Sequence, residues 1–306
     1  MRDNILALLR QGYQAATSVH PGAARALRPA ARLARKVLKV PAPTRPEAYV
    51  VGYPKVGNTW FQIMLRKAIV LHLGLPDDWI PRVVDPDPAE LPSAVPAIGV
   101  THNMPDLLTE TFHEMEQDFE PFHGKRVVLL TRDPKDVLVS LFMQYTHREE
   151  ERRLWCPVDE VVSHEIFGLD KYLKFYRQWN RNWNVPENVH LVRYEDMKQD
   201  SFGVVKTAFS RLGLEDLDEE VVGRAVEYGS FENMRQLEKT DALGLSTLAP
   251  SQRGGRESFK VRRGKVGGYA DYLAPETIEY INRRTQKELP KIYGYPLDAD
   301  PIRADA

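Results

Sequence analysis

Short β-like runs alternate with longer helical segments along most of this chain, and the alternation limits the folds open to it. Four runs rich in β-branched or aromatic residues end in polar or turn residues: AYVVGYP (48–54), AIGVTH (97–102), RVVLLTR (126–132) and NVHLVRYED (188–196). Helical candidates lie near residues 58–74, 134–150, 169–184 and 201–212. The pattern predicts βαβ units, and therefore a three-layer α/β/α domain around a mostly parallel sheet.

The composition argues against several classes of protein. A chain of 306 residues can bury a large core, and its net charge of −1 gives no reason to expect a nucleic-acid partner. The single cysteine, Cys156, excludes an internal disulfide and a cysteine-based metal cluster, as expected in a reducing compartment. Since we find neither a membrane-length apolar run nor the apolar core of a secretory signal, we expect a cytoplasmic protein.

Residues 1–45 look like an appendage, because they contain nine Lys or Arg against one Asp. The segment PAARLARKVLKV (29–40) predicts a basic amphipathic helix, followed by a linker, PAPTRP. This helix either packs on the domain as a solvated element, contacts anionic lipid at the inner face of a membrane, or belongs to an organellar targeting segment. The predicted organisation is thus an extension over 1–45, one domain over 46–298 and a tail over 299–306.

Chemistry-bearing residues follow each of the four predicted strands. Lys55 follows the first strand, His102 the second, Arg132 the third, and Tyr194 with Glu195 the fourth. Open parallel sheets bind ligands beyond the carboxyl ends of their strands. Together these side chains predict a site for an anionic ligand at that edge of the sheet.

The loop GYPKVGNT (52–59) resembles a phosphate-binding loop with a displaced lysine. In the pattern G-x-x-x-x-G-K-[ST] the lysine directly precedes the hydroxyl residue, but here Asn58 holds that position and Lys55 lies three residues earlier. Gly57 and the start of a helix could present backbone N–H groups to a phosphate, and Thr59 could add a hydroxyl. The alternative is an ordinary βα turn that carries a surface lysine.

The segment TRDPKDVLVS (131–140) predicts a sharp helix start after the third strand, with Asp133 as the cap. Arg132 and Ser140 could hold a second phosphate between them. The alternative is that Arg132 pairs with Asp133 or Asp136 and has a structural role only. We expect Lys135 to be solvated.

His102 suits a general base for a hydroxyl or a phenol, although a single histidine is often structural. The sequence offers no acidic cluster of the kind that a magnesium-dependent kinase uses, no G-x-S-x-G elbow and no H-E-x-x-H motif. We therefore expect no bound metal. The segment SQRGGRESFKVRRGKVGG (251–268) reads as a long, mobile, basic loop, and loops of that length are usually functional or disordered.

These motifs together resemble the cytosolic-type sulfotransferases. YPKVGNTW (53–60) is similar to the family's Y-P-K-[ST]-G-[TN]-T-W loop, which grips the 5′-phosphosulfate of 3′-phosphoadenosine 5′-phosphosulfate (PAPS). RDPKDVLVSLFMQY (132–145) resembles the segment that binds the 3′-phosphate, and VTHNMP (100–105) the stretch with the catalytic histidine. YEDM (194–197), GSFENMR (229–235) and RRGKVGGYADYL (262–273) match further elements in family order, from about residue 48 to 290.

The resemblance implies a role for each matching residue. The implied catalytic residues are Lys55 on the sulfonate, His102 as the base, and Ser140. The residues implied to hold the 5′-phosphate and the adenine are Gly57, Asn58, Thr59 and Trp60. Those implied to clamp the 3′-phosphate are Arg132, Ser140, Arg262, Arg263 and Gly264. Those implied to line the nucleotide pocket are Tyr194, Ser230 and Phe231.

The sequence also departs from the family pattern. Val56 replaces a hydroxyl residue of the loop, and Val100 replaces a lysine two residues before the histidine. In the closing element Arg263 replaces lysine, Gly268 replaces aspartate and Tyr269 replaces tryptophan. The departures indicate a distant branch, such as a bacterial one.

We therefore expect a P-loop-like fold and in-line transfer of a sulfuryl group from PAPS to a hydroxyl or amine of a small, apolar or lipid-like acceptor. The alternatives are a nucleotide-dependent kinase and a non-catalytic nucleotide-binding relative. Segment 240–261 is expected to cover the acceptor and to order with the nucleotide. Phe142, Met143, Tyr145 and Trp155 either line an apolar acceptor pocket or form helix core.

Overall fold

The structure is a computed structural model that describes residues 46–84, 97–104, 109–149, 154–251 and 255–296. The helix expected over 29–40, most of the linker after it and the tail over 299–306 lie outside the described residues. The predictions of a membrane contact and of an N-terminal appendage therefore stay predictions.

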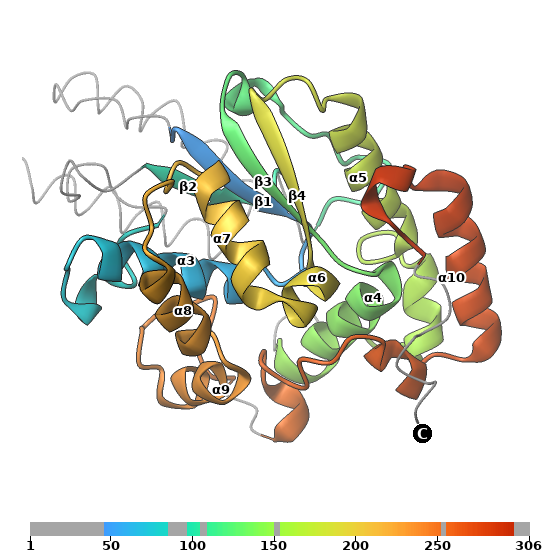
Figure 1. The fold of residues 1–306 in the computed structure, drawn as a ribbon. Coiled ribbons are helices and arrows are strands. Elements are labelled where there is room, and N and C mark those ends of the chain that lie inside the picture. Colours follow the sequence, from blue (N-terminus) through green and yellow to red (C-terminus); the bar gives the residue numbers. More distant parts are fainter. Residues whose placement is uncertain (1–45, 85–96, 105–108, 150–153, 252–254, 297–306) are drawn as a thin grey trace, which may run out of the picture. The chain divides into compact units, whose positions relative to one another are not determined.

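Four parallel strands form the sheet, in the order β2-β1-β3-β4 (Figure 1). Their bounds are Ala48–Gly52 (β1), Ile98–Thr101 (β2), Arg126–Thr131 (β3) and Asn188–Arg193 (β4). In the register, Val51 of the central strand β1 lies between Thr101 of β2 and Leu129 of β3. The carboxyl ends of all four strands therefore meet at one edge, which confirms the predicted parallel sheet.

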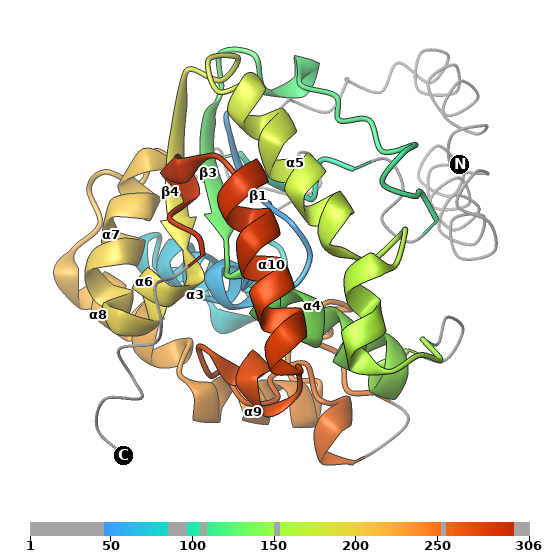
Figure 2. The ribbon, with the colours of Figure 1, turned by 90° about the vertical axis from the view of Figure 1, so that its right-hand side faces the viewer.

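Helices cover both faces of this sheet (Figures 1 and 2). One group comprises α3 (Asn58–His72), α7 (Ser201–Arg211) and α8 (Glu219–Tyr228), and the other comprises α4 (Pro134–Met143), α5 (Leu169–Arg181) and α10 (Pro275–Glu288). The short helix α6 (Tyr194–Gln199) follows β4, and α9 (Phe231–Thr240) follows α8. This arrangement is the three-layer α/β/α architecture that the alternation predicts.

The four predicted helices are present, with ends that differ by up to seven residues. The candidate over 134–150 is α4 as far as Met143 and continues as a π-helical turn over Gln144–Arg148. The residues YED, which we expected at the end of a strand, instead begin α6. Helices α8, α9 and α10 were not predicted, although α9 starts at a capping serine and α10 has a proline at its first position.

Buried tyrosines attach helix α5 to the end of strand β3. The hydroxyl of Tyr176 donates to the carbonyl of Leu130 over 2.8 Å, and the hydroxyl of Tyr172 donates to the carbonyl of Arg132 over 2.7 Å. Both tyrosine rings are fully buried. The core thereby fixes the backbone at the point where Arg132 leaves the sheet.

Lys135 is buried, so our expectation that it is solvated was wrong. Only 1% of the residue is exposed, and its Nζ lies 3.2 Å from Oδ2 of Asp133 and donates to Oδ1 of Asn282 over 2.6 Å. Its ammonium group also lies over the ring of Tyr269. The reason is that α10 and the segment around Tyr269 pack over the start of α4, which the local sequence does not reveal.

Substitution of the core residue Trp179 tests the packing. Its side chain is fully buried, edge-on against Phe119 and Phe122 at centroid distances of 5.0 and 5.1 Å. Trp179→Ala should lower the free energy of unfolding by about 3–5 kcal/mol, because it leaves a cavity. Ile292→Ala, at a residue 51% exposed, should change it by less than about 0.5 kcal/mol. Urea unfolding measures both, and equal losses would contradict the packing described.

Candidate active site

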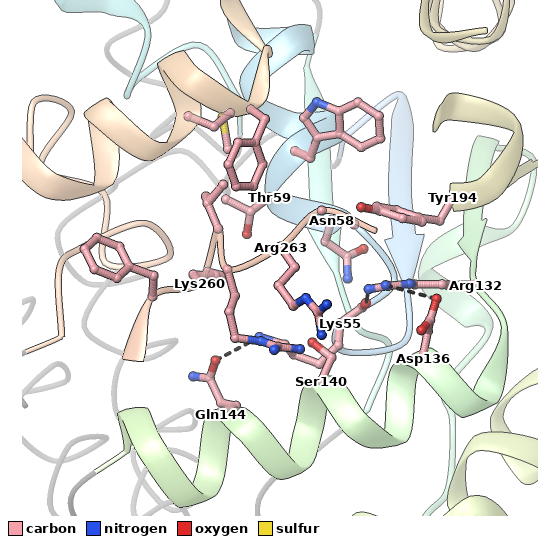
Figure 3. A pocket seen from close by; sticks show the side chains of 18 of the residues that line it. Lys55, Asn58, Thr59, Arg132, Asp136, Ser140, Gln144, Tyr194, Lys260 and Arg263 are labelled. Atoms are coloured by element: carbon pink, nitrogen blue, oxygen red, sulfur yellow. Dashed lines mark hydrogen bonds and ion pairs between the residues drawn. The ribbon is translucent and has the colours of Figure 1, made fainter. Parts of the chain in front are cut away.

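One cavity of about 560 Å³ lies at the carboxyl edge of the sheet (Figure 3). All the site residues expected from the sequence line it: Lys55, Gly57, Asn58, Thr59, Trp60, His102, Arg132, Ser140, Tyr194, Ser230, Phe231, Arg262, Arg263 and Gly264. Eight Lys or Arg line it against three acidic residues, so the cavity attracts anions. Glu195 does not line it; its carboxylate accepts from the backbone N–H of Asp133 and from the hydroxyl of Tyr295.

The loop between β1 and α3 takes a conformation that needs its glycines. Gly57 has φ +99°, and a Cβ there would lie 2.8 Å from Cδ2 of Tyr194. Asn58 donates from Nδ2 to the carbonyl of Tyr53 over 2.8 Å and so closes the loop from within. Gly57, the N-cap of α3, provides no side-chain cap, which leaves the first N–H groups of the helix available to an anion.

Lys55 lies in the same loop, with φ 71°, and projects into the cavity. Its Nζ donates to Oε1 of Gln144 over 2.8 Å, and Nε2 of Gln144 donates in turn to Glu149. Burial, followed by the positive charges of Lys260 and Arg148, lowers the pKa of Lys55 well below its ordinary value. An anion bound beside Lys55 would stabilise its charged form.

His102 follows β2 and presents one ring nitrogen as a base. Its Nδ1 lies 2.6 Å from the carbonyl oxygen of Gly52, which can only accept, so the proton resides on Nδ1 and Nε2 keeps its lone pair. Burial lowers the pKa of His102 below 6.5, and the charges of Lys260 and Lys55 add to this effect. The imidazole is therefore neutral at pH 7.

Arg132 lies at the end of β3. It lies between the loop that joins β1 to α3 and the segment over 262–273, which we call the closing segment. Its guanidinium donates to the carbonyls of Lys55 and Lys265 and lies 4.2 Å from the ring centre of Tyr194. It also pairs with Asp136 over 3.3 Å, which is the ion pair that the structural alternative expected, while its role in phosphate binding stays a prediction. Its buried Nε has no hydrogen-bond partner, which leaves a donor free.

The carboxylate of Asp136 fixes the closing segment over the cavity. It is 3% exposed and accepts from the backbone N–H groups of Gly267 and Tyr269, each over 3.0 Å. The same carboxylate pairs with Arg132. One buried acid thus connects the end of β3 with the segment that carries Arg262 and Arg263.

The two closing arginines are held by neighbouring polar groups. Arg262 donates to the hydroxyl of Tyr272 over 2.6 Å and to Glu257 over 3.1 Å, while Arg263 pairs with Asp271 over 2.7 Å. Both side chains line the cavity. Each guanidinium has further N–H groups that could bind a phosphate, which arginine recognises through two parallel hydrogen bonds.

Aromatic side chains form another wall of the cavity. The indole N–H of Trp60 donates to the carbonyl of Gly229 over 2.7 Å, and its ring lies edge-on to Tyr194 at 5.5 Å. Phe231, 36% exposed, follows the capping Ser230, and a Cβ at Gly264 would lie 3.0 Å from its ring. These rings could enclose a flat base.

A second group of charged residues lies at the cavity that the motifs did not predict. Arg148 pairs with Glu238 over 2.6 Å, and Glu238 is fully buried. Lys260 also lines the cavity, where burial and the charge of Arg148 lower its pKa to about 8. No motif or spacing identifies these residues, because their partners come from distant parts of the chain.

The residues considered for an apolar acceptor pocket take different positions. Met143 and Tyr145 are buried and line the cavity, whereas Phe142 packs against the core and Trp155 is 80% exposed. The segment over 240–261 contributes further cavity walls, including Leu248. It thus covers part of the cavity, while its ordering with nucleotide stays a prediction.

The part of the chain that the structure describes contains no group of three or more His, Cys, Asp or Glu residues placed to hold a metal ion. It also contains no helix with the length and apolar character that crossing a membrane requires.

Comparison with known proteins agrees with this geometry. The family model described as "Sulfotransferase domain" matches residues 45–293. Cytosolic sulfotransferase 17 of Arabidopsis thaliana is 27% identical over 263 residues, covering 76% of this chain and 71% of that protein. A mouse sulfotransferase solved with 3′-phosphoadenosine 5′-phosphate (PAP) has a TM-score of 0.55 at 18% identity, over 80% of this chain and 84% of that one.

A retinol dehydratase solved with androsterone and PAP has a TM-score of 0.56 at 16% identity, over 86% of this chain and 85% of that one. The two solved structures share the fold with this chain. The family model spans the sheet, the phosphate-binding type of loop and the closing segment. This chain therefore belongs to the sulfotransferase family.

Proposed function

We propose that this enzyme transfers a sulfuryl group from PAPS to a hydroxyl or amine of a small acceptor. The observation that supports this most strongly is the shared cavity of Lys55 and His102, in which the ring nitrogen Nε2 of His102 keeps a lone pair. Both solved structures named above contain PAP, the molecule that remains when PAPS has given up its sulfuryl group. The substrate would bind with its sulfuryl group between Lys55 and His102.

In this reaction the acceptor oxygen or nitrogen attacks sulfur while the bond from sulfur to the bridging oxygen of the 5′-phosphate breaks. The acceptor proton goes to Nε2 of His102, and the electron pair of the broken bond stays on the phosphate of PAP. Lys55 stabilises the negative charge that develops there. A sulfuryl group carries one negative charge fewer than a phosphoryl group, so its transfer depends less on neutralisation by a metal ion. A well-placed lysine can serve instead.

The arginines at the other end of the cavity are the proposed site for the 3′-phosphate. Arg132 has a free Nε, and Arg262 and Arg263 come from a segment far away in the sequence. Ser140 lines the cavity two turns into α4 and could add a hydroxyl. The 5′-phosphate would occupy the start of α3, near Gly57 and Thr59, with the base between Trp60, Tyr194 and Phe231.

The acceptor is proposed to be apolar, since Met143, Tyr145 and Leu248 contribute apolar wall. The relative crystallised with androsterone supports a small molecule of this kind. A cytoplasmic location is proposed because the curated relatives are named cytosolic. Contact of residues 1–45 with a membrane stays a prediction.

The function is tested with purified full-length protein, labelled PAPS and a panel of phenols, alcohols and amines. We expect PAP binding in calorimetry without magnesium, and transfer of label to at least one acceptor. Lys55→Ala and His102→Ala should each reduce turnover by about 10²- to 10⁴-fold, because they remove charge stabilisation and the base. His123→Ala, at an exposed histidine outside the cavity, is the matched control and should retain full turnover.

Three outcomes would contradict parts of this proposal. Full turnover of His102→Ala would remove the general base. Magnesium-dependent binding of ATP, without binding of PAP, would favour a kinase. Tight PAP binding without transfer to any acceptor would favour a non-catalytic relative.

Arg132→Met tests the proposed 3′-phosphate site. We expect PAP to bind about 10- to 100-fold more weakly, while AMP, which lacks the 3′-phosphate, binds with little change. The ratio of the two affinities in calorimetry separates lost phosphate binding from general destabilisation. Arg177→Met, at an arginine paired with Glu288 outside the cavity, is the control. An equal loss for PAP and AMP would remove Arg132 from the phosphate site.

The pH dependence of kcat/KM for PAPS tests the state of His102. A base must be unprotonated, and burial keeps the pKa of His102 below 6.5, so on the acid side activity should fall as the pH drops through a midpoint below 6.5. The measurement is kcat/KM between about pH 4.5 and 8, together with the remaining activity of His102→Gln, which should lack this fall. A wild-type midpoint above pH 6.5 would contradict the claim that the base is a buried histidine that is neutral at pH 7.

A further inference from the structure

Lys260 is a charged residue of the cavity to which neither the motifs nor the mechanism above assigns a role. It lies two residues before the closing segment (262–273) and lines the cavity with Lys55 (Figure 3), as does His102. Burial lowers the pKa values of Lys55 and His102, and the positive charge of Lys260 lowers both further, which agrees with its place in the same cavity.

The backbone at Lys260 is held in place by Glu238. The N–H groups of Lys260 and Val261 donate to the two oxygens of this carboxylate over 2.7 and 2.9 Å. Glu238 is fully buried and pairs with Arg148, which also donates to the carbonyl of Ser258. A residue whose backbone is fixed by a buried ion pair can hold its side chain at a defined place.

The ammonium group of Lys260 is not neutralised by an acid in direct contact. Its Nζ donates to the carbonyl of Thr247 over 2.6 Å, and within the described ranges no carboxylate oxygen lies within 4.0 Å of it. Glu238 and Glu149 act on it from further away, and Arg148 opposes them. A lysine with one neutral acceptor keeps donors and charge for an anionic group.

We propose that Lys260 is a second catalytic cation, which binds the sulfuryl oxygens together with Lys55 during transfer. This proposal rests on the proposed function. As the S–O bond to the phosphate breaks and the bond to the acceptor forms, Lys55 neutralises the leaving phosphate. Lys260 meanwhile holds the oxygens of the moving group, and His102 receives the proton.

The test compares two ligands that differ only in the sulfuryl group. Lys260→Met should lower kcat by about 10²- to 10³-fold, the usual cost of one donor to developing charge. Its affinity for PAP, which has no sulfuryl group, should change by less than about threefold. Turnover is followed as transfer of label from PAPS to the acceptor identified by screening, and as its slow hydrolysis to PAP and sulfate, which needs no acceptor.

Two further variants separate chemistry from structure. Lys260→Arg should recover part of the rate, because it keeps a positive charge at this position. Lys239→Met, at an exposed lysine next to Glu238 that does not line the cavity, is the matched control and should keep the wild-type rate. Melting temperatures are measured for all variants.

Three results would overturn the proposal. The first is a Lys260→Met enzyme with kcat within about threefold of wild type. The second is a loss of PAP affinity as large as the loss of kcat, which would make Lys260 a nucleotide ligand. The third is a Lys260→Arg enzyme, folded by its melting temperature, that is no faster than Lys260→Met. A wild-type protein that neither binds PAP nor consumes PAPS would contradict the proposed function itself, and this control is measured first.

Discussion

The buried carboxylate of Asp136 is the interaction on which the cavity depends. It pairs with Arg132 at the end of β3 and accepts the backbone N–H groups of Gly267 and Tyr269, so one side chain connects the sheet edge to the closing segment. A buried carboxylate is stable only when its hydrogen-bonding capacity is used. The cost of burying Asp136 is offset by contacts that hold the segment from which Arg262 and Arg263 line the cavity.

The cavity concentrates positive charge before any ligand is present. Burial lowers the pKa values of Lys55 and Lys260, and repulsion by neighbouring positive charges adds to this effect: Lys260 and Arg148 act on Lys55, and Arg148 acts on Lys260. An anionic ligand that binds only the folded protein relieves this repulsion and stabilises the fold. The geometry thus favours a strongly anionic cosubstrate, in agreement with the proposed use of PAPS.

The sequence predicted those parts of the fold and site that depend on local order. The strand ends could be predicted because each strand is a short run of β-branched residues, and parallel strands bring Lys55, His102 and Arg132 to one edge. The burial of Lys135 could not, because α10 covers it from more than a hundred residues away. Lys260 and Arg148 were not predicted for the same reason. Both contact Glu238, and these contacts join parts of the chain that are distant in the sequence. Asn58, in the lysine position of a phosphate-binding loop, proves to close the loop through Tyr53.

A crystal structure of the full chain with PAP tests the central claim most directly. The account predicts the 5′-phosphate at the start of α3 within hydrogen-bonding distance of Lys55. It also predicts the 3′-phosphate between Arg132, Ser140 and the closing arginines, and the space between Lys55, His102 and Lys260 left for the sulfuryl group. A nucleotide bound in the reverse orientation, or outside this cavity, would contradict the account.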